Sequence, residues 1–327
     1  MSTAATASQF IGTLSGNPAL VENRAGGGAN LDLVAPLAAG GMVHLVRIES
    51  GMWLGPFRFG KDLRETVEAC SMIQSNFGGN LEVLVRTRYS LKLLWLSSGR
   101  WFGPIHVPSP LTAGVPSLIQ STRGVRGNFE IVTPLCGGRI AYISRDNDDP
   151  RRPWRSSVFG REPSQQATEN RIAAVSLIQS NAGLEVVARY GNDLDIYWST
   201  DPMSNWKTID GPFHTGETDA PGPAGNPVLV KSRIGALPAS EVLVPWSSGG
   251  IAHFYRETGG PYGAWIGPTM LLTELGFIDD IAVSDTQEGG LLLMGRSGNE
   301  IWFARRGADL RWQTPVPLLS QGPAHAR

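Results

Sequence analysis

The sequence predicts an all-β, six-bladed β-propeller with four antiparallel strands per blade, chiefly because one residue recurs at a fixed period. Six tryptophans are separated by 48, 53, 52, 59 and 47 residues: Trp53, Trp101, Trp154, Trp206, Trp265 and Trp312. A period of about 40–55 residues built of short strands is typical of a propeller. The 40 glycines and 23 prolines fit short strands joined by many turns. We expect a single domain over residues 1–327, with blades at about 17–69, 70–115, 116–174, 175–225, 226–278 and 279–319.

Each repeat contains four predicted strands. The first is short and is best seen in the phrases Ser71–Asn76, Ser117–Thr122 and Ser176–Asn181, which share the pattern Ser-Leu/Met-Ile-Gln-Ser. The second strand alternates apolar and polar residues, which indicates a strand inside a sheet packed on both faces. The fourth opens with the repeat tryptophan, often followed by Gly-Pro as in Trp101–Pro104. Proline suits the outermost strand of a blade, because an edge strand needs fewer hydrogen-bond donors.

Two kinds of blade alternate along the chain, so the ring is expected to have approximate three-fold symmetry. The second strand ends in proline in the odd blades and in arginine in the even blades: Pro36, Pro134 and Pro245 against Arg86, Arg189 and Arg296. The third strands differ in the same way: His44, Tyr142 and His253 against Leu93, Ile196 and Trp302. The odd blades also carry an arginine three residues later: Arg47, Arg145 and Arg256.

Composition disfavours several classes of partner. The chain has 28 basic and 29 acidic residues, a net charge of −1, and no long run of either sign, so we expect no nucleic-acid partner. No apolar segment is long enough to span a bilayer, and residues 1–16 lack the pattern of a signal peptide. We therefore expect a cytoplasmic protein with no membrane partner. Cys70 and Cys136 are expected to be reduced thiols, with a disulfide bond between them left open.

Cofactor and metal motifs do not occur in the sequence. It contains no phosphate-binding Gly-x-x-x-x-Gly-Lys-Ser/Thr, Gly-x-Ser-x-Gly, His-Glu-x-x-His or Cys-x-x-Cys, so neither a cofactor nor a metal ion is expected. The acidic run Asp146–Asp149 could offer oxygen ligands to a cation. Because Arg151 and Arg152 follow it, we interpret it as a self-neutralised turn.

Side chains of the second and third strands form the candidate site. An acidic residue recurs in the second strand of five blades, which favours a scaffolding role between blades: Asp32, Glu82, Glu130, Glu185 and Glu241, with Leu292 in the sixth blade. We interpret His44, His253 and Tyr142 as candidate catalytic residues, because imidazole and phenol groups transfer protons. The candidate substrate-binding residues are Arg86, Arg189, Arg296, Trp246 and Trp302, expected near the central funnel.

Several phrases resemble the repeats of known propellers. The pattern Ser-Leu-Ile-Gln-Ser, the segments Gly127–Val132 and Ile251–Arg256, and Trp-x-Gly-Pro are similar to repeats of bacterial and fungal propellers, including lectins of the Photorhabdus type. That resemblance implies a glycan partner and a similar sugar pocket at each blade interface. The tryptophans outside the repeat frame do not recur at one position, which weighs against repeated sugar-stacking sites: Trp95, Trp198, Trp246 and Trp302.

A second resemblance concerns size and blade count. Six degenerate blades in about 330 residues are similar to the fungal hetero-Diels–Alderases that join tropolones to terpenes. This implies a cofactor-independent cyclase or lyase of natural-product biosynthesis, acting on an aromatic or terpenoid small molecule. Such an enzyme would work by orienting its substrate more than by a nucleophile. We therefore expect a small-molecule enzyme with one asymmetric pocket at the central funnel. The alternatives are a glycan-binding lectin with sites between blades, and an interaction scaffold.

Overall fold

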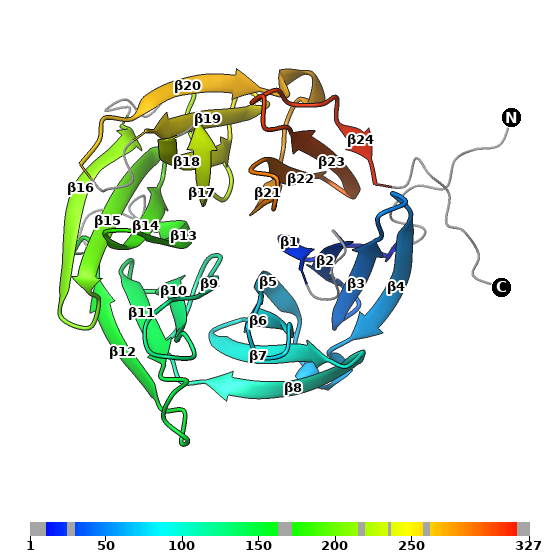
Figure 1. Cartoon of the computed structure of the whole chain (residues 1–327), viewed down its shortest axis with the longest axis vertical. Helices are drawn as coiled ribbons and strands as arrows, with labels where there is room; N and C mark the ends of the chain where they lie inside the picture. Colours follow the sequence, from blue (N-terminus) through cyan, green and yellow to red (C-terminus); the bar gives the residue numbers. More distant parts are fainter. Residues whose placement is uncertain are drawn as a thin grey trace, which may run out of the picture.

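In the computed structural model the chain forms six four-stranded antiparallel sheets arranged as blades around a central axis (Figure 1). The structure describes residues 11–24, 30–162, 172–214, 220–234, 237–257 and 262–318. Each blade is built from four consecutive strands, with the first at the axis and the fourth at the rim. The expected six-bladed propeller is therefore confirmed.

Four concentric sets of strands make up the ring. The innermost strands are β1 (Ala19–Asn23), β5 (Val67–Gln74), β9 (Ser117–Gln120), β13 (Ile172–Ser180), β17 (Val228–Ile234) and β21 (Asp280–Asp285). The second strands are β2 (Asn30–Pro36), β6 (Leu81–Thr87), β10 (Phe129–Pro134), β14 (Gly183–Tyr190), β18 (Leu237–Pro245) and β22 (Leu291–Ser297). The third strands are β3 (Met42–Arg47), β7 (Ser90–Ser97), β11 (Ile140–Arg145), β15 (Asp193–Asp201), β19 (Ile251–Arg256) and β23 (Glu300–Arg306). The outermost strands are β4 (Trp53–Phe59), β8 (Arg100–Val107), β12 (Trp154–Phe159), β16 (Asn205–Phe213), β20 (Ile266–Leu271) and β24 (Val316–Pro317).

The links between blades contain little helix. Two 3-10 turns, η1 (Lys61–Leu63) and η3 (Thr273–Leu275), lie between the outermost strand of one blade and the innermost strand of the next. In the part of the chain that the structure describes, no helix has the length and apolar character needed to cross a membrane.

The recurrent Ser-Leu-Ile-Gln-Ser phrase joins neighbouring innermost strands. Ser71 and Ser117 each accept a hydrogen bond from a backbone amide of the next blade, at Leu118 and Leu177, both at 3.0 Å. The glutamine of the phrase bonds to the preceding blade instead of the next one. Gln120 Oε1 accepts a 2.8 Å hydrogen bond from the amide of Asn76 in the preceding blade. The phrase therefore holds the ring together around its axis.

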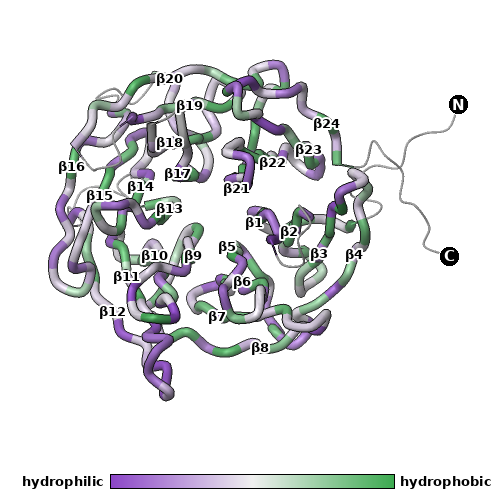
Figure 2. The backbone as a smooth tube through the Cα atoms, in the orientation of Figure 1, coloured by the Kyte–Doolittle hydropathy of each residue, from purple (hydrophilic) through white to green (hydrophobic). Residues whose placement is uncertain are grey.

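One apolar cluster fills each of the six interfaces between successive blades. The six repeat tryptophans each pack against the cluster shared with the preceding blade. In Figure 2 the hydrophobic colour follows the strands, whereas hydrophilic colour gathers at the connections, including the segment that projects from the rim between β11 and β12. The core is thus a ring of separate interfaces.

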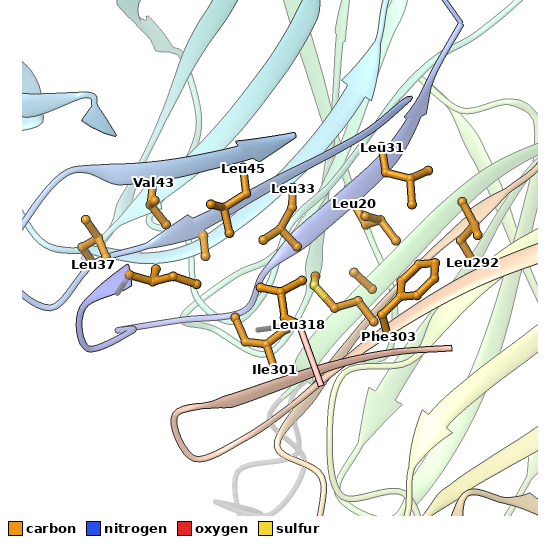
Figure 3. Close-up of a cluster of buried hydrophobic side chains, with 14 residues drawn as sticks. Leu20, Leu31, Leu33, Leu37, Val43, Leu45, Leu292, Ile301, Phe303 and Leu318 are labelled. Atoms are coloured by element: carbon orange, nitrogen blue, oxygen red, sulfur yellow. The ribbon is translucent and has the colours of Figure 1, made fainter. Parts of the chain in front are cut away.

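The seam between the sixth and first blades is closed by side chains (Figure 3). Leu33 and Leu45 of the first blade meet Ile301 and Phe303 of the sixth. Residues 9–14 are expected from the sequence to add a strand across this seam. Of these, Ile11 packs into the seam cluster and Leu14 pairs with Leu37, while residues 9 and 10 lie outside the described residues.

The Trp-x-Gly-Pro phrase marks a bulge where the fourth strand leaves the third. In β8, Gly103 has φ +94°, and a Cβ there would lie 2.8 Å from the carbonyl oxygen of Leu93. Register shifts in the same place, between Leu93 and Trp95. Only glycine tolerates both the positive φ and this close approach. The phrase is therefore explained by backbone geometry.

Candidate functional site

A carboxylate on the second strand lies at five of the six interfaces, and in the second and third blades the last serine of the innermost-strand phrase helps to hold it. The five carboxylates are all buried: Asp32, Glu82, Glu130, Glu185 and Glu241. Ser75 Oγ donates to Glu82 Oε1 at 3.1 Å, and Ser121 Oγ donates to Glu130 Oε1 at 2.8 Å. Burial of a carboxylate is costly unless it is paired, so the other partners of each one decide its role.

In the odd blades the carboxylate is bonded within its own blade. Asp32 Oδ1 lies 2.6 Å from His44 Nε2, and Glu241 Oε2 lies 2.5 Å from His253 Nε2. Tyr142 donates a short hydrogen bond to Glu130 Oε2. In each case the third-strand residue pairs with the position two residues after the acid. The two side chains therefore lie on one face of the sheet.

The predicted catalytic residues are thus held in three separate blades. His44 is 4% exposed, and the ring of Trp101 packs edge-on against it at 5.5 Å between centroids. Tyr142 is 1% exposed and has a similar contact with Trp206. Each of these groups contacts its own acid, and the three lie on β3, β11 and β19, in the first, third and fifth blades. Their catalytic role stays a prediction.

Carboxylates of the fourth and fifth blades form ion pairs with an arginine on the third strand of the next blade. Glu185 Oε2 accepts a 2.5 Å hydrogen bond from Arg256 Nη2, and both side chains are almost completely buried. Glu241 receives two hydrogen bonds from Arg306, at 2.5 and 2.6 Å. Bidentate and charge-assisted contacts of this kind are strong. They close these interfaces.

Between the second and third blades the same two residue types are separated by a cavity. Within the described residues, no carboxylate oxygen lies within 4 Å of the Arg145 guanidinium, although Arg145 is the counterpart of Arg256. Instead Arg145 Nε donates to Asn147 Oδ1 at 2.8 Å, and its guanidinium lies 4.2 Å from the centre of the Phe129 ring. The carboxylate of Glu82 is left on the opposite wall.

This cavity has a volume of about 240 Å³ and a mixed lining. Its lining residues are Phe77, Asn80, Glu82, Leu93, Trp95, Ile105, Arg145 and Arg152. Trp95 is half-buried and pairs directly across the sheet with Glu82, so the indole and the carboxylate share a face. Arg152 comes from the β11–β12 connection, where its guanidinium lies 5.9 Å from the centre of the Phe77 ring. An apolar wall with a few charged groups is the usual character of a ligand pocket.

The charged groups of the cavity influence one another. Burial raises the pKa of Glu82, against the hydrogen bond from Ser75 and the charges of Arg145 and Arg152. Burial lowers the pKa of Arg145 to about 10; Glu82 opposes this change and Arg152 adds to it. Glu241 shows the contrast. Burial alone would raise its pKa, but hydrogen bonds with His253 and Arg306 outweigh burial and lower the pKa to about 2. The anionic form of Glu82 in the cavity is therefore much less stabilised than the anionic form of the paired Glu241.

The three predicted substrate-binding arginines brace turns between second and third strands. Each donates to the carbonyl two residues later in the chain: Arg86 to Arg88 at 2.7 Å, Arg189 to Gly191 at 2.8 Å and Arg296 to Gly298 at 3.0 Å. Two of them also form ion pairs, Arg86 with Glu68 at 2.6 Å and Arg296 with Asp280 at 2.5 Å. Burial lowers the pKa of Arg189. None of the three lines the cavity between the second and third blades.

The two predicted substrate-binding tryptophans are buried in the core. Trp246 packs edge-on against Phe213 at 4.9 Å between ring centres, and Trp302 fills the space above Gly295. The alignment that places Trp302 opposite His44 is wrong by one residue. Phe303 pairs with Met294 and so occupies the equivalent position, because the sixth blade's register places Trp302 on the other face of β23.

The central funnel contains cavities of a different kind. On the side of the turns between first and second strands, a cavity of about 520 Å³ is lined by all six innermost strands. A cavity of about 810 Å³ on the same side is lined mostly by the fifth and sixth blades, with residues that include Lys231, Asp285 and Glu288. Toward the beginnings of the innermost strands, a smaller cavity of about 180 Å³ is also lined by all six of them. The 810 Å³ cavity is lined mainly by charged and polar residues, whereas the enzyme expected from the sequence would need apolar walls for a terpenoid.

The carboxylates of the acidic segment Asp146–Asp149 accept hydrogen bonds from backbone amides of this turn and of a neighbouring loop. Asp146 Oδ1 accepts the amide of Asp148 at 3.0 Å, and Asp148 carboxylate oxygens accept the amides of Val125 and Arg126. Among the residues the structure describes, no group of three or more potential protein ligands could hold a metal ion. Both cysteines are free, with Cys70 buried and Cys136 exposed.

The pairing of a second-strand acid with the next blade's arginine is the feature that sequence patterns alone missed. The second-strand acids, such as Glu82, and the third-strand arginines, such as Arg145, each recur in the sequence. The two members of a pair, however, lie in different blades. The arginine lies one repeat plus the step from the second to the third strand beyond the acid. This recurring offset is the signal that could have joined them, because successive blades pack face to face.

Comparison with known proteins yields structural relatives alone. No protein-family model matches this sequence, and no curated protein sequence does. The fold is similar to the fucose-recognising six-bladed lectin of Aleuria aurantia, with a TM-score of 0.66 and 14% identity over 97% of this chain and 99% of that chain. It is also similar to the lectin BP39L of Burkholderia pseudomallei, with a TM-score of 0.59 and 16% identity over 93% and 85%. A variant of AofleA from Arthrobotrys oligospora gives 0.64 and 10% over 93% and 87%. At these identities the likeness shows the fold alone.

Proposed function

We propose that this protein is a glycan-binding propeller lectin whose principal sugar site is the cavity between the second and third blades. One observation carries the proposal: Glu82, Arg145, Arg152 and Trp95 converge on a cavity of about 240 Å³ in which the acid and the arginines are not paired with each other. A volume of this size suits a single sugar ring. Each of the other acids of the repeat is bonded by a histidine, tyrosine or arginine side chain.

Each wall has a part in binding a pyranose. The Glu82 carboxylate would accept hydrogen bonds from ring hydroxyls, and the guanidinium nitrogens of Arg145 would donate to neighbouring oxygens. The indole of Trp95 offers a flat apolar surface for the carbon face of the ring, supported by Phe102 stacked at 5.8 Å with a 15° interplanar angle. Arg145 is fixed by Asn147 and Phe129, so little ordering is needed when the sugar binds.

Structures that share this fold support the same class of function. The Aleuria aurantia lectin is described as recognising fucose, and a SapL1 lectin with a TM-score of 0.65 and 14% identity is described in complex with α-methyl fucoside. A fucoside is therefore the first neutral probe to test here.

The small-molecule enzyme expected from the sequence is the weaker proposal. It requires His44, Tyr142 or His253 to face a substrate, and each of them is engaged by a buried or nearly buried acid. A thermal-shift screen with tropolones and terpenoids tests it directly. Stabilisation by such a compound that is lost on His44→Ala or His253→Ala would favour the enzyme over the lectin.

The lectin is tested by a glycan array followed by titration calorimetry. Trp95→Ala should weaken binding at least about 30-fold, since a buried aromatic anchor contributes about 2 kcal/mol or more. Glu82→Gln should weaken it as well, because an amide accepts fewer hydrogen bonds than a carboxylate. The matched control is Trp198→Ala, which removes the corresponding indole of the fourth blade.

The pattern of losses identifies the site. Loss of array binding on Trp95→Ala with binding retained on Trp198→Ala places the sugar between the second and third blades. Equal losses in both variants would contradict a single principal site. An array with no binding at any glycan would contradict the lectin.

A further inference from the structure

The charged side chains that line the cavity between the second and third blades are not paired with one another, whereas the corresponding residues at two other interfaces form ion pairs. Its charged lining residues are one carboxylate, Glu82, and two guanidiniums, Arg145 and Arg152. Within the described residues, neither guanidinium has a carboxylate oxygen within 4 Å, whereas Arg306 has one at 2.5 Å. The cavity therefore carries an excess of positive charge that the protein does not balance at close range.

The buried position of Arg145 makes that excess significant. Arg145 is 6% exposed, and its Nε is used by Asn147, while Nη1 and Nη2 make no hydrogen bond within the described part of the chain. A buried guanidinium with no carboxylate in contact is costly, and an anion bound beside it would offset that cost. The burial-lowered pKa of Arg145, to which Arg152 contributes, agrees with this.

We infer that this cavity selects an acidic sugar, one that carries a carboxylate or sulfate group beside its hydroxyls. The inference rests on the proposed lectin function and names the class of ligand for the same site. The planar fork of an arginine matches carboxylate and sulfate oxygens, and a second arginine at the rim adds a further set of donors. The ring hydroxyls would lie toward Glu82 on the opposite wall.

Attraction by the whole protein does not account for such a preference. The net charge of the chain is −1, so any attraction of an anion must come from the local arrangement. The cavity also has an apolar wall, made by Phe77, Leu93, Trp95 and Ile105. Full contact with this wall requires a sugar ring, so an anion alone would not fill the site. A free inorganic sulfate should thus bind much more weakly than a sulfated sugar.

The test is a set of calorimetric titrations on the full-length protein with ligands matched in pairs. Glucuronate is compared with glucose, galactose 6-sulfate with galactose, and methyl α-L-fucoside and inorganic sulfate are included as neutral and anionic probes. We expect each acidic sugar to bind about tenfold more tightly than its neutral counterpart, as a charge-assisted contact requires. The carboxylated and sulfated pairs show which anion fits.

Variants separate the charge from the rest of the site. Arg152→Gln should reduce the acidic-over-neutral preference to about threefold or less, because it removes the exposed second cation. The control, Arg151→Gln, removes a neighbouring exposed arginine that does not line the cavity and should leave the preference unchanged. Neutral sugars that bind as tightly as acidic ones would overturn the inference and leave the lectin intact. Failure of every sugar to bind would overturn both, and binding of inorganic sulfate as tight as the sulfated sugar would overturn the selection of a sugar.

Discussion

The interface between the second and third blades and the interface between the fourth and fifth blades are built from the same kinds of residue. Their corresponding members are Glu82, Leu93, Trp95 and Arg145 in one, and Glu185, Ile196, Trp198 and Arg256 in the other. In the latter the acid and the arginine meet at 2.5 Å; in the former they line opposite sides of a cavity of about 240 Å³.

The difference depends on where the arginine is held. Asn147 takes the Nε of Arg145, and Phe129 lies beneath its guanidinium, so the side chain is kept within its own blade. Arg256 reaches across to Glu185 in the preceding blade. A repeated pair can therefore close an interface in one place and leave a ligand site in another, without a change in the repeated residues themselves.

Glu185→Ala should show the largest effect, because it breaks the closed interface. Removing one partner of a buried ion pair leaves the other charge uncompensated and typically costs about 3–5 kcal/mol. Urea unfolding monitored by circular dichroism measures the loss. The double variant Glu185→Leu with Arg256→Met should recover most of it, because apolar side chains replace both charges. A single variant as stable as the wild type would show that this pair does not hold the interface.

The next effect is a pH dependence that comes from Glu241. Its folded-state pKa of about 2 lies below the ordinary value of 4.5, so its contribution to stability is fully present above the unfolded pKa and is lost as the pH falls toward 2. A difference of this size corresponds to about 3 kcal/mol. Free energies of unfolding measured from pH 6 to pH 2 should fall more steeply for the wild type than for Glu241→Gln. Parallel curves for the two proteins would contradict the paired anion.

Glu82→Gln should have the smallest effect on stability, and with the opposite sign. Burial raises the pKa of Glu82 in the folded protein, so its ionisation destabilises the fold as the pH rises from the unfolded pKa through the folded one. The neutral amide removes that loss, and the variant should be slightly more stable than the wild type at pH 7 in thermal unfolding. Glu185→Gln is the comparison, since there the same change should be clearly destabilising. A loss of stability at both positions would mean that Glu82 is paired after all.

Much of the fold could be predicted from the sequence, because the repeat makes local signals add up. The six tryptophans, the Ser-Leu-Ile-Gln-Ser phrase and the Trp-x-Gly-Pro bulge each report a local contact that recurs, and the structure confirms six blades of four strands. The alternation of blade types was also visible. It corresponds to the acids of the odd blades that bond His44, Tyr142 and His253 within the blade.

The site could not be predicted in the same way, because it depends on register and on contacts between blades. His44 was predicted to act on a substrate because imidazole titrates near neutrality, but the pairing of β2 with β3 places it against Asp32. A shift of one residue likewise separates Trp302 from the position that Phe303 occupies. Whether Arg145 reaches Glu82 is decided by Asn147, a residue outside the repeat pattern.

The sixth and first blades pack against each other through side chains, as the other neighbouring blades do. The ring should therefore keep the same order of blades wherever the chain begins and ends. Because each blade is one contiguous segment and the seam is closed by side chains such as Leu33 and Phe303, a circularly permuted chain opened between other blades should fold to the same ring. The cavity needs two adjacent blades joined by their own short link. It is therefore a transferable module, and a gene that duplicated this pair of blades would multiply the site.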